Sequence, residues 1–435
     1  MLTEQKLSTA EGARIAVVAG VRTPFNLKDS GFKQVFAADL GTMVTNELLN
    51  RFPFDRRLIQ QLIFGQVIQQ PHVANIAREI AVTLGLYHVQ AYTVSSSCVT
   101  GLQAVANIAS SIASGSILSG IAGAADSISN SSLSINPRML QIGKDILQAK
   151  GWERKFGLLK QLSWQDFKPH GVNLRDYITG YSVADVSEQM AKLFSISRRE
   201  QDEFTLDSLH KAKSAWLEGL LKDQVMVSFP YPYENFVVAD NLLQSSHTAA
   251  YYAGLKPLID KKYGSVTAGN IAPICDGAGA LLLMREDIAK AEGLVPLGYI
   301  RSYAMTGNEV WENMLSGTAY AASLALMRAG MKPSDMDLFD FHESSAAQIL
   351  ANLRLFEDGE FARCYLNRSS AIGAVDPTRL NVLGGSLAYG NPRAVTGLRI
   401  LIQALFELKR RNGQLALVAT SGLGGLGGAM VLERE

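Results

Sequence analysis

The sequence predicts an α/β protein that is built from two similar halves. Short apolar runs alternate with helical runs along most of the 435 residues, a pattern typical of layered α/β folds. In addition, motifs from the first quarter of the chain return in the same order near its end, which indicates a duplication.

The candidate strands are mostly continuous apolar runs rather than alternating ones. Continuous runs are typical of sheets that are covered on both faces. We expect strands at residues 14–19, 90–94, 120–125, 278–284, 297–303, 338–341 and 414–419.

Two pairs of segments carry the repeat. Val-Thr-Gly-Leu occurs at 99–102 and again at 395–398, and each copy opens a helix between two strand-like runs. The second pair, at 64–78 and 339–354, places an aromatic-rich strand end before a helix that contains Ala-Asn-x-x-Arg or a close variant. The order of the copies favours one half at 1–130 plus 263–290 and another at 291–435.

The stretch between the halves, residues 131–262, is more charged and is expected to be an inserted domain. It carries helix signals at 183–196 and 197–221, and Ser197 with Glu200 forms a capping box at the start of the second. A basic amphipathic run lies at 138–162. This run is either a solvated helix face or a docking surface for a partner, an anionic cofactor or a membrane.

Composition excludes several classes of protein. With 41 basic and 40 acidic residues, the net charge of +1 argues against a nucleic-acid binder. Three cysteines do not make a disulfide framework, and no Cys/His spacing predicts a metal site. No apolar run is long enough for a transmembrane segment, and the N-terminus lacks a signal peptide, so we expect a cytoplasmic protein with reduced thiols.

Two residues lie at positions where catalytic side chains are expected. Cys98 follows a strand-like run and begins a small-residue helix, whose dipole would favour the thiolate. It is therefore a candidate nucleophile, although free cysteine is also commonly a small buried hydrophobe. His342 lies between a strand and a helix, where α/β proteins gather ligand-binding groups, but it is equally open to a structural role.

Two glycine-rich segments complete the candidate chemistry. Residues 381–392 let the backbone approach a substrate closely. Residues 420–428 form a strand–turn–strand signal whose glycines could expose N–H groups as an oxyanion hole. Either segment alone is also compatible with ordinary tight turns.

Together these segments resemble the thiolase superfamily over nearly the whole chain, and most of all the long-chain 3-ketoacyl-CoA thiolase subunits of fatty-acid β-oxidation complexes. The segments that carry the likeness are 20–25, the helix after Cys98, 264–284, 342–352, 381–392 and 425–433. The resemblance implies a five-layered αβαβα core of duplicated halves, with 131–262 as the loop domain on the coenzyme A side.

The resemblance also implies ligands and partners. The substrate would be an acyl-CoA or acyl-carrier-protein thioester, with no separate cofactor and with no nucleic acid bound. The chain would form a homodimer or larger assembly and could associate with a hydratase/dehydrogenase subunit. Ala268, Gly269 and Ala272 would lie beside coenzyme A, with Ala272 where short-chain members often carry a small polar residue.

The catalytic positions of the family are only partly kept. In the resemblance, Cys98 forms the acyl-enzyme and His342 binds or activates the thioester. The activating histidine is replaced by Asn391, in Gly390-Asn391-Pro392, and the second cysteine is replaced by Ser421. Backbone N–H groups of Cys98 and of the turn at Ser421, Gly422 and Leu423 would form the second oxyanion hole.

These departures make ordinary thiolysis doubtful. Asparagine cannot accept a proton as a base, serine is a weaker acid than cysteine, and losing a general acid or base costs about 10²–10⁴-fold in rate. Three functions therefore stay open. The first is a thiolase-like acyltransferase. The second is decarboxylative condensation with a malonyl thioester through a Cys98–His342–Asn391 triad, as in ketoacyl-ACP synthase III-like enzymes. The third is an inactive paralogue that serves as a scaffold or regulatory subunit.

Overall fold

The computed structural model describes residues 6–132, 136–168, 171–245 and 247–435. Its strands form a continuous 10-stranded sheet system that consists of two halves. The first half has the order β4-β3-β5-β6-β1, and the second continues as β7-β10-β9-β8. The strands are β1 (Ile15–Arg22), β3 (Gln61–Gly65), β4 (Gln90–Val94), β5 (Ser119–Asp126), β6 (Cys275–Arg285), β7 (Gly298–Gly307), β8 (Leu338–Phe341), β9 (Leu415–Gly422) and β10 (Leu426–Glu433), with the short β2 (Asn26–Leu27) beside β6.

The two halves repeat the same pairing. In the first half β3 and β5 are parallel, and β6 and β1 follow antiparallel. In the second half β8 and β9 are parallel, and β10 and β7 follow antiparallel. The halves meet where Ala16 and Val17 of β1 pair with Tyr299 and Gly298 of β7. The duplication that the sequence predicts is therefore confirmed in the topology.

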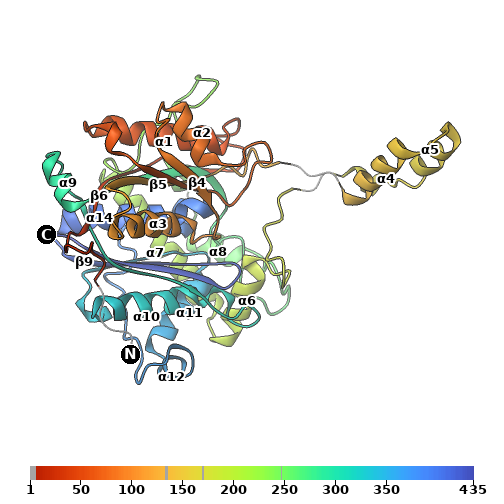
Figure 1. The fold of residues 1–435 in the computed structure, drawn as a ribbon. Helices are drawn as coiled ribbons and strands as arrows, with labels where there is room; N and C mark the ends of the chain where they lie inside the picture. Colours follow the sequence, from red (N-terminus) through yellow and green to blue (C-terminus); the bar gives the residue numbers. More distant parts are fainter. Residues whose placement is uncertain (1–5, 133–135, 169–170, 246) are drawn as a thin grey trace.

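Helices cover and separate the two sheets, so that five layers are stacked (Figure 1). The helices α1 and α2 lie on the outer face of the first sheet, α3 and α14 lie between the sheets, and α10 and α11 cover the second. Their bounds are Ala37–Arg51, Ile76–Thr83, Thr100–Ala113, Thr396–Arg411, Gly317–Ala329 and Ala346–Glu357, in that order.

The repeated Val-Thr-Gly-Leu motif explains why the central helices pack so closely. A Cβ on Gly101 would lie 2.8 Å from the amide nitrogen of Leu398, and one on Gly397 would lie 2.6 Å from that of Leu102. Each motif glycine thus faces the other helix, and any larger residue would force α3 and α14 apart.

All seven expected strands are present, as β1, β4, β5, β6, β7, β8 and β9. The sequence did not predict bounds for β2, β3 or β10. β2 has only two residues, β3 was indicated only by the aromatic strand end at residue 64, and β10 only as the second strand of the signal at 420–428. The helix expected at 197–221 is α7. It begins directly after the predicted Ser197 cap and ends at Leu217, earlier than expected.

The inserted stretch has three parts. The helices at 183–193 and 198–217 pack against α11 of the second half, residues 225–240 lie beside β1 of the first half, and the basic run projects from the body as an arm (Figure 1). This arm consists of α4 (Pro137–Gln148) and α5 (Trp152–Leu159), which are separated by residues 149–151, where Gly151 has a φ of 89°. Its apolar side chains Leu147 and Trp152 are 84% and 74% exposed. In the described ranges, no helix is long and apolar enough to cross a membrane.

The remaining helices of the described residues are short or lie near the site. They are α6 (Val183–Leu193), α8 (Ala249–Gly254), α9 (Glu286–Ala291), α12 (Gly359–Leu366) and α13 (Ser386–Tyr389).

A buried ion pair fastens the end of the insertion to the core. The guanidinium of Arg22 on β1 donates to both carboxylate oxygens of Asp240, at 2.7 and 2.8 Å, and both side chains are fully buried. One of those oxygens also accepts from the amide of Phe25. Because a buried charge is tolerated only when paired and hydrogen-bonded, this contact fixes the returning chain beside β1.

Candidate active site

Cys98 lies in the turn between β4 and α3. Two hydrogen bonds shape this turn: the amide of Ser96 donates to the hydroxyl of Thr100 at 2.7 Å, and that hydroxyl donates to the carbonyl of Ser97 at 2.6 Å. Ser97 takes a positive φ of 50°. Cys98 follows with only 5% of its surface exposed, two residues before the first helical residue. The expected position at the start of the helix is thus nearly met.

The expected thiolate is not the resting form. Burial raises the pKa of the Cys98 thiol above its ordinary value. The charge of Arg393 and hydrogen bonds from Asn391 and Ser97 lower it, and the carboxylate of Asp126 raises it further, but burial dominates. The sequence shows the helix terminus but not the depth of burial, and desolvation of the charged form outweighs the helix dipole here.

Asn391 is the side chain that contacts the sulfur. Its Nδ2 lies 3.7 Å and its Oδ1 3.9 Å from Sγ of Cys98. The hydroxyl of Thr396 donates to Oδ1 at 2.9 Å, and the amide of Asn391 donates to the carbonyl of Pro273 at 2.8 Å. Because an amide oxygen has two lone pairs, Oδ1 can accept from the Cys98 thiol as well as from Thr396, whereas a thiolate would accept from the N–H₂ group.

Gly390 lets this loop pass close to the core. Its φ is 91°, and a Cβ at this position would lie 2.8 Å from Sγ of Cys275. Both the backbone conformation and the lack of space require glycine. Cys275 itself is buried, and its pKa is raised well above the ordinary value by burial, so it is an unreactive thiol.

His342 follows β8 and is fully buried. Its amide donates to the carbonyl of Ala419, and its Nδ1 lies 2.9 Å from the hydroxyl of Ser386. Nε2 is buried and has no hydrogen-bond partner among the described residues. Burial, together with the positive charges of Arg399 and Arg393, lowers the pKa of His342 to about 3. The imidazole is therefore neutral at physiological pH, and no hydrogen bond joins it to Cys98 or Asn391 within the described ranges.

The glycine-rich C-terminal segment differs in detail from the expectation. Ser421 and Gly422 are the last residues of β9 rather than part of a turn, and the turn to β10 comprises Leu423, Gly424 and Gly425. Ser421 and Gly422 stay in the strand because they pair with Gly427 and Leu426 of β10. The Ser421 hydroxyl is buried and unpartnered among the described residues.

The end of β9 nevertheless touches the backbone of Cys98. A Cβ on Gly422 would lie 3.1 Å from the amide nitrogen of Cys98, and the hydroxyl of Thr420 donates to the Cys98 carbonyl at 3.4 Å. The amide of Cys98 is therefore brought beside the strand that leads into Leu423, as an oxyanion hole would require.

Two further charged residues of the site, Asp126 and Arg393, are not predicted by any sequence motif. Asp126, at the end of β5, is fully buried and accepts from the amides of Val67, Ile68 and Ala394 at 2.9, 2.7 and 2.9 Å. Burial raises its pKa to about 6. Arg393 is 6% exposed, with a positive φ of 30°. A lone aspartate after an apolar run and a lone arginine after a proline are too common to be singled out.

The residues expected beside coenzyme A lie in a loop that has its own network of stabilising contacts. Ala268 is exposed, Gly269 is half-buried and Ala272 is buried. A Cβ on Gly269 would lie 2.5 Å from Leu255 and 2.7 Å from Tyr252.

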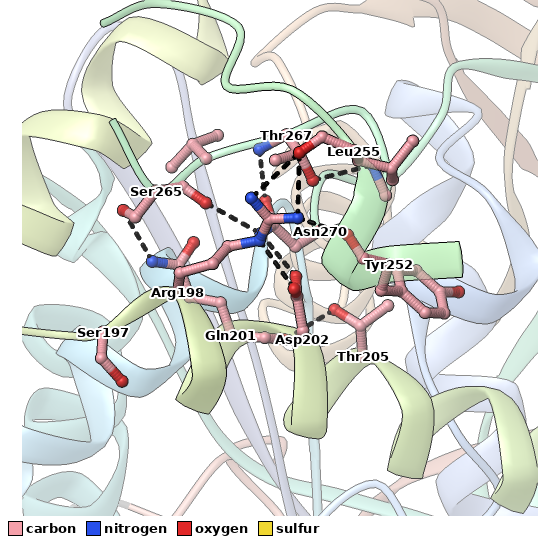
Figure 2. A network of polar contacts seen from close by, with 12 residues as sticks. Ser197, Arg198, Gln201, Asp202, Thr205, Tyr252, Leu255, Ser265, Thr267 and Asn270 are labelled. Atoms are coloured by element: carbon pink, nitrogen blue, oxygen red, sulfur yellow. Dashed lines mark hydrogen bonds and ion pairs between the residues drawn. The ribbon is translucent and has the colours of Figure 1, made fainter. Parts of the chain in front are cut away.

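A polar network holds this loop against α7 and α8 (Figure 2). Arg198 donates to Asp202 at 2.6 Å and to the carbonyls of Leu255 and Tyr252. Asn270 donates to the other carboxylate oxygen of Asp202 at 3.1 Å and accepts from the amide of Thr267 at 2.8 Å. The loop is thus positioned by the inserted stretch.

Family models match both halves of the chain. The model described as "Thiolase, N-terminal domain" matches residues 15–287, and the one described as "Thiolase, C-terminal domain" matches residues 294–434. Together they span nearly all of the fold and the site described above. The chain belongs to the thiolase family, which confirms the resemblance and the thiolase fold.

Individual relatives agree over the full length. The chain is 46% identical over 430 residues to the 3-ketoacyl-CoA thiolases of Escherichia coli O81 (strain ED1a) and Shigella boydii serotype 18 (strain CDC 3083-94 / BS512), covering 99% of both sequences in each comparison. Among solved structures, the acetyl-CoA acetyltransferase of Bacillus anthracis superposes with a TM-score of 0.83 at 28% identity, covering 97% of this chain and 98% of the other. Human mitochondrial 3-ketoacyl-CoA thiolase in complex with CoA gives 0.82 at 26% identity, covering 99% and 100%.

Proposed function

We propose that the chain is an acyl-CoA acyltransferase that makes or breaks the C–C bond of 3-ketoacyl thioesters through an acyl-enzyme on Cys98. The observation that carries this proposal is the Cys98 sulfur, which lies at the start of a central helix against the Asn391 amide. The full-length relatives named 3-ketoacyl-CoA thiolase support the substrate class.

In the degradative direction, the Cys98 thiolate adds to the ketone carbon of the substrate. The bond between C2 and C3 breaks, the electron pair goes to C2 of the departing acetyl-CoA, and C2 takes up a proton. The thiol of a free coenzyme A then attacks the acyl-enzyme, and Cys98 is released. The backbone amides of Cys98 and Leu423 would stabilise the oxyanion. Nε2 of His342 would donate a hydrogen bond to the thioester oxygen, either directly or through a bridging group.

Decarboxylative condensation is the second candidate, and one observation favours it. The site offers no base beside Cys98, because Asn391 is an amide, Ser421 replaces the second cysteine, and the lowered pKa of His342 makes it a poor base. In this reaction an acyl-CoA first transfers its acyl group to Cys98 and leaves as coenzyme A with the thiol proton. A malonyl thioester then loses CO₂, and the freed electron pair attacks the acyl carbon. The C–S bond to Cys98 breaks, and the released thiolate takes up a proton from solvent. No C–H proton has to be removed.

One experiment separates the candidate functions. The purified protein is incubated either with a 3-ketoacyl-CoA and coenzyme A, or with an acyl-CoA and a malonyl thioester on coenzyme A or carrier protein. Thiolysis products support the first function, whereas 3-ketoacyl product with CO₂ supports the second. If neither reaction occurs with several chain lengths, both enzymatic proposals fail and the scaffold or regulatory subunit is favoured. The variant Cys98→Ala is the control for both reactions.

We also propose that the chain is a dimer or larger assembly. β4 is an edge strand of the sheet, with half-buried side chains at Ala91, Tyr92, Thr93 and Val94. An unprotected edge of this kind is suited to pairing with a second copy. Light scattering on the purified chain would report a mass of at least twice the 47.1 kDa monomer, and a monomeric mass would contradict the proposal.

The arm of α4 and α5 is our candidate for contact with a hydratase/dehydrogenase subunit. It projects from the core and exposes large apolar side chains, including Leu140, Leu147, Trp152 and Phe156. Exposed apolar clusters of this kind usually mark interaction sites. Co-purification of the chain with such a subunit, and its loss after Trp152→Ser, would support this role.

A further inference from the structure

Arg393 is a buried arginine that differs from the other buried arginines of this fold in its interaction partners. The two fully buried arginines Arg22 and Arg399 each pair with an aspartate, Asp240 or Asp340. Arg393 is 6% exposed, yet in the described ranges no ion pair joins it to a carboxylate. Its Nη2 donates to the carbonyl of Leu174 at 3.3 Å, and its Nε is buried with no partner there.

The backbone places Arg393 at the edge of the Cys98 site. Arg393 lies two residues after Asn391 in the sequence. The Nδ2 atom of Asn391 lies 3.7 Å from the Cys98 sulfur. The amide of the next residue, Ala394, donates to Asp126, and the carbonyl of Ala394 would lie 2.9 Å from a Cβ on Gly101 in the first turn of α3. The segment is therefore fixed between β5 and the helix that begins beside Cys98.

The backbone of Arg393 is strained at this point. Its φ of 30° lies in the left-handed region, which a residue with a long side chain rarely adopts. Strain of this kind persists only where the surroundings hold the residue in place, and it is concentrated at functional sites.

Charged groups around Cys98 act in opposite directions. The positive charge of Arg393 lowers the pKa of the thiol, whereas burial and the negative charge of Asp126 raise it. His342 is neutral because its own pKa is lowered, in part by Arg393 and Arg399. Of the groups that affect the Cys98 thiol, Arg393 is the one that brings a positive charge. A thiolate in a buried site needs such a charge close by.

We propose that the Arg393 guanidinium is the counter-ion of the Cys98 thiolate, in a site that lacks the histidine otherwise expected next to Pro392. The thiol proton leaves to solvent, the thiolate pairs with the guanidinium, and the anion then attacks the ketone carbon of a 3-ketoacyl-CoA or the thioester carbon of an acyl-CoA. The group that leaves, C2 of acetyl-CoA or the coenzyme A thiolate, takes up a proton in turn. Arg393 thus acts on the reaction through Cys98 and needs no contact with the substrate. Its importance for acyl transfer rests on the function proposed above.

The test measures Cys98 without any thioester. Iodoacetamide alkylation of Cys98 is followed by peptide mass spectrometry between pH 6 and 10 in the full-length chain, with the exposed Cys364 replaced by serine. We compare the parent with Arg393→Met, Arg393→Gln and Arg393→Lys, and use Arg363→Met, an exposed arginine on α12, as the matched control.

The neutral variants should shift the midpoint of alkylation upward by about one pH unit, so that the rate below the midpoint falls about tenfold. Arg393→Lys should keep the rate within about threefold of the parent, because it retains the charge. An unchanged or lowered midpoint in both neutral variants, or an equal upward shift in Arg393→Lys, overturns the proposal. Because alkylation requires no thioester, a protein without acyltransferase activity can still pass this test, and the two proposals fail separately.

Discussion

The side-chain amide of Asn391 lies against the sulfur of Cys98, with Nδ2 3.7 Å from Sγ and Oδ1 held by the hydroxyl of Thr396. An amide in this position can donate a hydrogen bond to a thiolate but cannot take the proton from a thiol. The site is therefore arranged to stabilise a charged sulfur and not to generate it by base catalysis.

Restoring a base at this position should restore thiolysis. The double variant Asn391→His with Ser421→Cys should increase the rate of 3-ketoacyl-CoA cleavage by at least about 10²-fold, because it regains a general base and a general acid. Initial rates of thiolysis check this expectation. Asn391→Gln with Ser421→Ala is the control that supplies neither group. A folded double variant with no gain in rate would show that other differences limit thiolysis.

His342 should stay neutral across the physiological pH range. Burial and two nearby guanidinium groups lower its pKa to about 3, so its imidazole signal in an NMR titration should not move between pH 8 and pH 5. The spectrum of His342→Asn assigns the signal among the six histidines. A titration midpoint near 6.5 would refute the neutral state.

The same pKa shift makes stability depend on pH. In the unfolded chain His342 takes up a proton as pH falls below about 6.5, whereas in the folded chain it does so only near 3. The unfolded state therefore binds more protons in this window, and the free energy of unfolding should decrease as pH falls from 6.5 toward 3. Urea unfolding should show a weaker decrease for His342→Asn; equal pH dependence in both proteins would contradict the shift.

Asp126 should be needed to hold the loops around Cys98. Its carboxylate accepts from three backbone amides, and Asp126→Ala would leave them buried without partners. We expect a loss of about 2–4 kcal/mol in the free energy of unfolding, measured in urea. Asp223→Ala, at an exposed aspartate, is the matched control and should change stability by less than about 0.5 kcal/mol. Equal effects of the two substitutions would argue against this role.

The buried pair of Arg22 and Asp240 gives a second prediction about stability. Asp240→Ala should destabilise the fold by about 3–5 kcal/mol, because it leaves an unpaired buried guanidinium. The double variant Arg22→Met with Asp240→Leu removes both charges and should recover most of that loss in the same unfolding measurement. A double variant no more stable than Asp240→Ala would show that unpaired charge is not the cause.

Removing the arm should leave the core intact. α4 and α5 pack against each other and project from the body, so replacing residues 137–160 by a short Gly/Ser linker should shift the melting temperature by no more than about 2 °C. The same deletion should abolish binding to a hydratase/dehydrogenase subunit. A large drop in melting temperature would instead show that the arm contributes to the stability of the core.

The architecture could be predicted from the sequence because it follows from local and repeated sequence patterns. Continuous apolar runs marked β5 and β6, and the two Val-Thr-Gly-Leu copies marked α3 and α14. β10 was indicated only as the second strand of the signal at 420–428, without bounds, because its first residues, Leu426 to Gly428, have the composition of a turn. A strand that begins in glycines is stabilised by its neighbours β7 and β9 and not by its own propensity.

The site was less predictable because its chemistry depends on burial and on contacts between distant residues. Cys98 and Asn391 are 293 positions apart, and their contact exists only once both halves are folded. The raised pKa of Cys98 and the lowered pKa of His342 both follow from desolvation, which no local motif encodes. Arg393 and Asp126 were missed for the same reason, since only burial makes their charges significant.

Acylation of Cys98 is the most direct test of the central claim. The protein is incubated with acyl-CoA and 3-ketoacyl-CoA thioesters of several chain lengths, and the peptide that contains Cys98 is analysed by mass spectrometry. We expect the mass of one acyl group on Cys98, and none on any peptide of Cys98→Ala. If iodoacetamide labels Cys98 but no thioester acylates it, the account of Cys98 as an acyl carrier is contradicted.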